Sequence, residues 1–170
     1  MSLPFLDSDT DMHLNLGALL IVMEVLSKTR RGRLVLNNGR LHIFLYLVKN
    51  PVALNNVLNL CGKDSVILMQ VETYSINAIS PNFDTLFDRA ALKSLLITLV
   101  SKDLIEVHFK KKDGFFYALT ERGVEMSLSL NSDYFSEIRS SCVNMMSIQS
   151  LSESKLNDHL NEVIRRESSL

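Results

Sequence analysis

Apolar residues recur along this chain in runs that predict a mostly helical protein. The first run, from Leu14 to Leu26, places apolar side chains on almost every side of a helical projection. A helix over 14–29 is therefore expected to be buried nearly all round, in a core or against another protein. Lys28 and Arg30 favour a helix C-terminus, where the helix dipole stabilises cations, and Gly32 is expected to end the helix.

Shorter apolar segments follow, separated by turn and capping residues. Leu34 to Leu36 predicts a single short strand, and Asn37-Asn38-Gly39 is turn chemistry. Helices are predicted over 40–49 and 51–60, because apolar residues recur there at intervals of three and four. Asn50-Pro51 marks their junction, since Asn caps helices well and Pro is tolerated at the first helical position.

The middle of the chain predicts two further helices. Within residues 64–79 a helix to about Asn77 is favoured, although the apolar run there also fits a strand. Asp84 can cap a helix over about 85–101, whose leucines form one apolar stripe.

Residues 103–120 change to a period of two. Ile105, Val107 and Phe109 alternate with polar residues, which predicts a strand with one buried face. Asp113-Gly114 is a strong hairpin signal, and the apolar residues after it supply the return strand. We therefore expect a β-hairpin directly behind the preceding helix.

The residues after the hairpin complete the expected fold. The Thr120 hydroxyl is expected to cap a helix over about 124–130. Two more helices are predicted over about 133–147 and 152–166, with Ser132 or Asp133 and Ser152 as their caps. A helix, a hairpin and a second helix in this order are typical of the second half of a winged helix.

The expected fold class is thus mainly α (α+β): a winged helix with a β-hairpin wing at about 103–120, flanked by N-terminal and C-terminal helices. We divide the chain into a flexible N-terminal segment (1–13), an N-terminal helical region (14–79), a winged-helix region (80–131) and C-terminal helices (132–170). A second, degenerate winged helix within 14–79 stays an open alternative.

Composition narrows the range of functions. With 170 residues and 46% hydrophobic residues, the chain suffices for one domain, or two very small ones, with a real core. Its 18 basic and 19 acidic residues argue against a protein wholly devoted to nucleic acid, although a local basic patch is compatible with them. The isolated Cys61 and Cys142 fit a reducing cytosol, and no run is apolar and long enough for a membrane span. A cytoplasmic protein is expected.

No catalytic chemistry stands out in the sequence. The four histidines show no ligand spacing with one another or with a cysteine, and phosphate-loop and nucleophile-elbow motifs are missing from the sequence. We therefore assign no catalytic, metal or cofactor-binding residue and do not expect an enzyme. A triad assembled in space from distant residues stays open.

Two sets of residues are candidates for binding. In winged helices that bind DNA, the helix before the wing enters the major groove and the wing contacts phosphates. The candidate DNA contacts are Arg89, Lys93, Lys110, Lys111 and Lys112. Seven basic and seven acidic residues share the window 84–125, so a solvated hairpin turn is the competing interpretation of the three lysines.

The second set comes from the apolar excess of the first two predicted helices and from a methionine pair. Methionine-rich apolar faces suit adaptable interfaces, and ordinary core packing is the alternative. The candidate partner interface comprises Leu19, Met23, Phe44, Met145 and Met146.

Several phrases resemble known families when taken in order. Tyr117 to Gly123 resembles the wing exit of winged-helix regulators, in which a Thr caps the next helix. The wider set of phrases is Leu14 to Leu20, Phe44 to Pro51, Leu58 to Lys63, Leu86 to Asp88, Asp113 to Tyr117 and Lys155 to Asn157. Their order resembles the middle component of bacterial ABC-three-component systems, a group that includes the small accessory subunit of Lamassu-type defence systems.

This resemblance implies a role that the residues alone do not show. Such a subunit would be a non-catalytic adaptor that binds a coiled-coil ABC ATPase of the SMC or Rad50 type. It would help couple DNA sensing to an effector nuclease against phage or plasmid DNA, and it would meet DNA through the complex. The alternative is a stand-alone winged-helix transcription regulator, which would be a two-fold dimer on palindromic DNA. Whether the chain self-associates is open.

Overall fold

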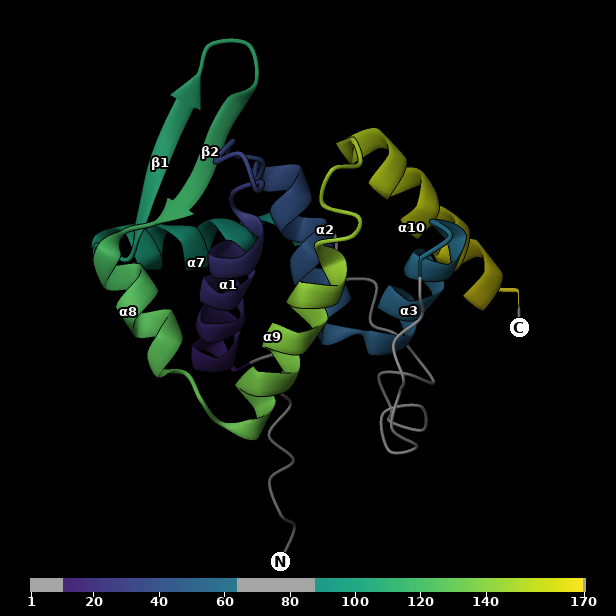
Figure 1. Cartoon of the computed structure of the whole chain (residues 1–170), viewed down its shortest axis with the longest axis horizontal. Helices are drawn as coiled ribbons and strands as arrows, with labels where there is room; N and C mark the ends of the chain where they lie inside the picture. Colours follow the sequence, from purple (N-terminus) through teal and green to yellow (C-terminus); the bar gives the residue numbers. More distant parts are fainter. Residues whose placement is uncertain (1–10, 64–87, 170) are drawn as a thin grey trace, which may run out of the picture.

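A computed structural model describes residues 11–63 and 88–169 of the chain. In this part, seven helices and one two-stranded antiparallel hairpin form a mainly helical fold (Figure 1). The elements are α1 (Met12–Leu26), α2 (Asn38–Lys49), α3 (Pro51–Leu60), α7 (Arg89–Ser101), β1 (Ile105–Lys110), β2 (Gly114–Leu119), α8 (Glu121–Ser129), α9 (Asp133–Met145) and α10 (Glu153–Glu167). The helix predicted to about Asn77 and the predicted cap Asp84 lie outside the described residues.

Helix α1 is the central element of the fold. It packs against α2, α7, α8, α9 and β2, and it stands between them in Figure 1. All residues from Gly17 to Met23 are buried, which confirms the predicted all-round burial. The helix begins at Met12, because the Asp11 carboxylate accepts hydrogen bonds from the backbone N–H groups of His13 and Leu14 at 2.8 and 3.1 Å.

The C-terminus of α1 differs from the prediction. The helix ends at Leu26 rather than at 29, and the predicted helix-ending cations lie beyond it in a turn that contains Gly32 at φ +75°. The last carbonyls are satisfied by the buried Gln149, whose Nε2 donates to the backbone oxygens of Leu26 at 2.7 Å and Lys28 at 3.1 Å. A side chain distant in sequence therefore ends this helix.

The next segment connects α1 to the hairpin and to α2. Leu34 forms an isolated bridge with Lys28, and the Leu36 carbonyl accepts a hydrogen bond from the Tyr117 N–H at 3.0 Å. The Asn37 side chain caps α2 by accepting from the Arg40 N–H at 3.0 Å. The predicted short strand is thus a pair of isolated contacts, one of which reaches β2.

Helix α3 has the predicted bounds and Asn50 is its N-cap residue, as predicted, but the Asn50 side chain does not make the expected capping hydrogen bond. Asn50 gives α3 no side-chain hydrogen bond; its Nδ2 instead donates to the Tyr46 carbonyl of α2 at 2.7 Å. Two helices meet at Asn50, and the side chain serves the earlier one. Helix α3 ends where Gly62 adopts φ +65°, which lets the Lys63 N–H reach the Leu58 carbonyl at 2.9 Å.

Helix α7 and the hairpin form one continuous unit. Asp88 caps α7 through the Ala91 N–H at 2.9 Å. The helix ends at Ser101, two residues before Asp103 adopts φ +56°, and the Leu104 N–H then bonds the Leu99 carbonyl at 3.0 Å. Strands β1 and β2 pair antiparallel from Ile105 opposite Leu119 to Lys110 opposite Gly114, which confirms the predicted hairpin.

The predicted buried face of β1 is only partly correct. Ile105 at the base is buried, whereas Val107 and Phe109 are 44% and 66% exposed. The base of the hairpin packs on α7 and α1, and its outer half projects beyond the helices in Figure 1. The alternation of apolar and polar residues therefore identifies the apolar face of β1, but α7 and α1 cover only the base of that face.

The junction after the hairpin is tightly built. The Thr120 hydroxyl accepts from the Gly123 N–H at 3.0 Å, which confirms the predicted cap, and donates to the Asp103 carbonyl at 2.7 Å. Helix α8 begins at Glu121, earlier than predicted. A Cβ built on Gly123 would lie 1.9 Å from the Leu104 carbonyl oxygen, so only glycine fits there.

The C-terminal helices close the core against α1, α2 and α3. Ser132 and Ser152 cap α9 and α10, as predicted. Glu24 on α1 forms an ion pair with Arg139 on α9 and accepts a hydrogen bond from the Ser127 hydroxyl on α8. This network explains why a carboxylate is tolerated in the apolar first helix, since a partly buried charge needs a partner.

Candidate functional site

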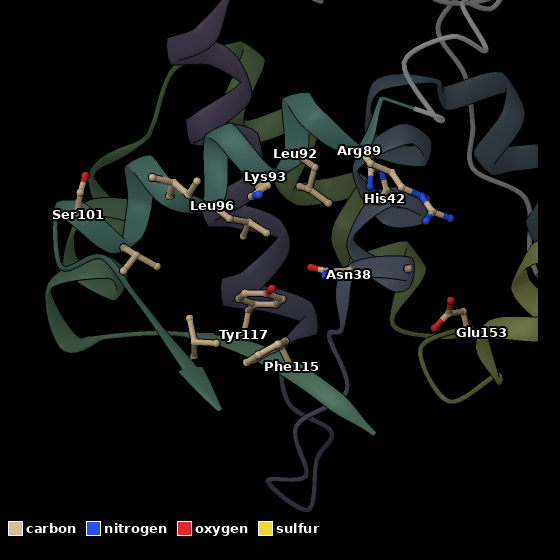
Figure 2. Close-up of a pocket in the computed structure, with 14 residues that line it drawn as sticks. Asn38, His42, Arg89, Leu92, Lys93, Leu96, Ser101, Phe115, Tyr117 and Glu153 are labelled. Atoms are coloured by element: carbon tan, nitrogen blue, oxygen red, sulfur yellow. The ribbon is translucent and has the colours of Figure 1, made fainter. Parts of the chain in front are cut away.

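A groove lies between α7 and the apolar face of the hairpin. Its cavity measures about 870 Å³, and the N-terminal ends of α2 and α10 close one end (Figure 2). Leu92 and Leu96 on α7 face Tyr117 across it, and all three are buried. We call this site the α7–hairpin groove; it is lined by Asn38, Gly39, His42, Arg89, Leu92, Lys93, Leu96, Ile97, Val100, Ser101, Val107, Phe115, Tyr117 and Glu153.

Exposed apolar side chains line the open half of the groove. Ile97 and Val100 on α7 are 58% and 46% exposed, and Phe115 on β2 is 51% exposed. Val107 on β1 continues the same surface, and the Phe109 ring lies 5.2 Å from the Phe115 ring. Contiguous exposed apolar groups are unfavourable in water, and such patches mark sites that another molecule covers.

Polar and charged side chains occupy the other half. Arg89 and Lys93 are exposed on α7, and neither forms a salt bridge with another described residue. Burial lowers the pKa of His42, and the charge of Arg89 lowers it further while Asp88 opposes the shift. The lowered pKa favours the neutral form of His42 beside the Arg89 cation. Because His42 adds no charge, Arg89 and Lys93 make this end of the groove positive.

The wall opposite Arg89 is fixed by a loop from the C-terminal helices. The Arg40 guanidinium donates to the Gln149 carbonyl at 2.8 Å and to the Leu151 carbonyl at 2.5 Å. Glu153 accepts from the Asn37 side chain at 2.8 Å and lies directly against Gly39. These bonds hold the start of α10 on the start of α2, so this end of the groove is preformed.

The predicted DNA contacts fall into two separate places. Arg89 and Lys93 line the groove, whereas Lys110, Lys111 and Lys112 lie at the hairpin tip outside it. The Lys110 ammonium sits 4.3 Å from the centre of the Phe116 ring, a cation–π contact. Lys111 and Lys112 are exposed.

The predicted partner interface is mostly core. Leu19, Met23, Phe44 and Met145 are fully buried, because α1, α2 and α9 pack on one another and use these side chains. Of the five, only Met146 is exposed. The exposed apolar residues of the groove were not predicted from the sequence. Ile97, Val100, Val107 and Phe115 belong to three elements, and each looks like an ordinary core position in its own apolar run.

His108 bonds Glu106 at 2.9 Å on the exposed side of β1. Among residues 11–63 and 88–169, no three His, Cys, Asp or Glu side chains gather closely enough to hold a metal ion. None of the helices in these ranges is both long and apolar enough to cross a membrane.

Comparison with known proteins identifies the family. Searches of curated proteins and of solved structures found no match. A family model described as ABC-three component (ABC-3C) system Middle Component 4 matches residues 26–158, a range that contains α2, α3, α7, the hairpin, α8, α9 and every residue that lines the groove. A middle component of a multi-component system implies partner proteins. The chain belongs to the middle component 4 family of ABC-three-component systems.

Proposed function

We propose that this chain is a non-catalytic adaptor whose α7–hairpin groove binds another protein of its system. The observation that carries the proposal is the exposed apolar surface of Ile97, Val100, Val107 and Phe115 around a preformed cavity. Membership of a multi-component family supports a protein as the occupant.

The element order supports a winged helix as the framework. Helices α1, α2 and α7 would be its three helices, and β1 and β2 its wing. The Leu36 carbonyl, bonded to the Tyr117 N–H, occupies the place of the short strand between the first two helices. Helix α3 would then belong to an insertion between the second and third helices.

The surface chemistry of α7 favours protein over DNA as the main ligand. A helix that reads the major groove needs polar side chains that reach base edges. Here the exposed side of α7 carries Ile97 and Val100 as well as Arg89 and Lys93. Placing two aliphatic side chains against polar base edges and phosphates would forfeit the gain from burying them.

The family resemblance supplies the proposed partners. We propose a coiled-coil ABC ATPase of the SMC or Rad50 type as the direct partner, in a cytoplasmic complex that also holds an effector nuclease. The adaptor would help couple DNA sensing to that nuclease in defence against phage or plasmid DNA, as in a Lamassu-type system.

Co-purification tests the adaptor role. Ile97→Glu should remove the ATPase from the tagged chain, since it places a charge on the apolar half of the groove. Val143→Glu is the matched control, because Val143 is 54% exposed on α9 and does not line the groove, against 58% for Ile97. Recovery of no ATPase with the wild-type chain, or equal loss with both variants, would count against the proposal.

A stand-alone DNA-binding regulator is the second candidate, favoured by the exposed Lys111 and Lys112 at the hairpin tip. In that case the purified chain alone should bind duplex DNA at physiological salt as a dimer. Changing Lys110, Lys111 and Lys112 together to Glu should weaken binding and flatten its salt dependence. A chain that binds no duplex without its partners would exclude this candidate.

A further inference from the structure

We infer that the occupant of the α7–hairpin groove is an amphipathic partner helix that places a carboxylate against Arg89 and Lys93. This inference rests on the proposed adaptor function and specifies what the adaptor recognises. It follows from which surface of the hairpin faces the groove and from how charge is distributed along α7.

The hairpin offers the groove a face rather than an edge. Val107 and Tyr117 are a directly paired position across the two strands, as are Phe109 and Phe115. The side chains that line the groove therefore stand on one face of the sheet, and the backbone hydrogen bonds of the hairpin lie in the plane behind them.

An extended peptide is a poor occupant for such a wall. Its backbone N–H and C=O groups would face the side chains of Val107 and Phe115 and stay unpaired, which is costly in an apolar site. A helix satisfies its own backbone and presents only side chains. The apolar wall thus selects a helix.

The length of the groove sets the pattern of that helix. Helix α7 has 13 residues and is about 20 Å long, so a partner helix of three to four turns can lie along it. Ile97 and Val100 lie in its C-terminal half with the exposed hairpin residues opposite. Partner residues at spacings of three and four would fill this half.

The charges fix one orientation for the partner. Lys93 and Arg89 lie about one and about two helical turns from Ile97 along α7. A Glu or Asp on the partner, one to two turns from its apolar anchors, would meet these cations. Glu153 at the far wall is held in place by its bond to Asn37. Its negative charge would repel a second acid placed beyond Arg89.

Photo-crosslinking in the full chain, expressed with the other components of its system, tests the inference. The photoreactive residue p-benzoylphenylalanine replaces Ile97 or Phe115, with Val143 as the control position. We expect both groove positions, and not position 143, to crosslink to one peptide of the ATPase that carries the apolar spacing and a nearby acid.

A charge exchange provides the second readout. Lys93→Glu should lower ATPase recovery by about tenfold, equivalent to about 1.4 kcal/mol, and changing the identified acid to Lys should restore it. Lys102→Glu, an exposed change on the end of α7 outside the groove, should have no effect.

The two proposals fail in different ways. An ATPase that co-purifies but crosslinks only from position 143, or through a segment without the acid or the apolar spacing, overturns this inference and leaves the adaptor role standing. Crosslinks to a second copy of this chain also overturn it. A complex that never forms overturns both.

Discussion

Single residues decide how the hairpin joins the helices on either side. Thr120 uses one hydroxyl to cap α8 and to bond the Asp103 carbonyl, and Gly123 lets the first turn of α8 approach the backbone of Leu104. The Thr cap was predictable because capping is local in sequence. The contact at Gly123 could not be predicted in this way, because it joins the first turn of α8 to Leu104, which directly precedes β1.

Gly123→Ala should therefore destabilise the protein. At an open helical site this change stabilises by about 0.5–1 kcal/mol, but here the new Cβ would overlap the Leu104 carbonyl oxygen. We expect a net loss of about 2–3 kcal/mol and a Tm lower by roughly 4–12 °C. Glu125→Ala, an exposed change in the same helix, is the control for thermal unfolding. An unchanged Tm for Gly123→Ala would contradict this prediction, because it would show that the backbone near Leu104 shifts to accommodate the new Cβ.

At the scale of elements, periodicity predicted every helix and strand that the structure describes, with bounds that shift by a few residues. The errors occurred at helix ends, where a distant side chain or a choice between two neighbouring helices decides the hydrogen bonds. Gln149 ends α1, and Asn50 serves α2 although it directly precedes α3. Alternation predicted the hairpin but could not show that none of the described helices covers its outer half.

The Arg40 guanidinium supplies two of the hydrogen bonds that attach the start of α10 to α2. Arg40→Lys should loosen this attachment, because an ammonium cannot hold the Gln149 and Leu151 carbonyls in the fixed fork geometry of arginine. We expect a loss of about 1–2 kcal/mol and faster amide exchange at the start of α10. Arg165→Lys, on the exposed side of α10, should change neither. Equal exchange in the two variants would contradict the role given to Arg40.

At the scale of the whole molecule, one core joins residues from the first helix to the last, and the groove is what this core leaves uncovered. The sequence predicted an apolar surplus and a protein partner, but it placed the interface on Leu19 and Phe44, which the core uses. The burial of a side chain depends on which faces of the helices and strands pack together. The hydrophobic periodicity of one segment cannot show which apolar face remains exposed in the folded protein.

Global stability should also carry a small pH dependence from Glu167. Burial raises the pKa of this carboxyl above its ordinary value of 4.5, and the hydrogen bond from Asn56 only partly opposes the shift. At neutral pH, ionising this carboxyl therefore costs more free energy in the folded state than in the unfolded chain. This penalty is relieved as pH falls through the raised pKa, because the folded state takes up the proton first.

Glu167→Gln should accordingly raise the free energy of unfolding at pH 7, by less than about 1 kcal/mol because the site is only partly buried. The gain should shrink at pH 4, where this carboxyl is mostly protonated in both the folded and the unfolded state. Urea unfolding at the two pH values measures it, with the exposed Glu137→Gln as the control. A variant less stable than the wild type at pH 7 would refute the argument.

The central position of α1 has a consequence for biosynthesis. Glu24 and its partner Arg139 are 115 positions apart, and Gly17 packs against Phe135. A ribosome that adds 5–20 residues per second needs about 6–23 s to make the segment that covers this helix. During translation the apolar α1 leaves the ribosome before α9, which covers one side of it, so nascent chains should depend on a ribosome-associated chaperone more than the finished fold suggests.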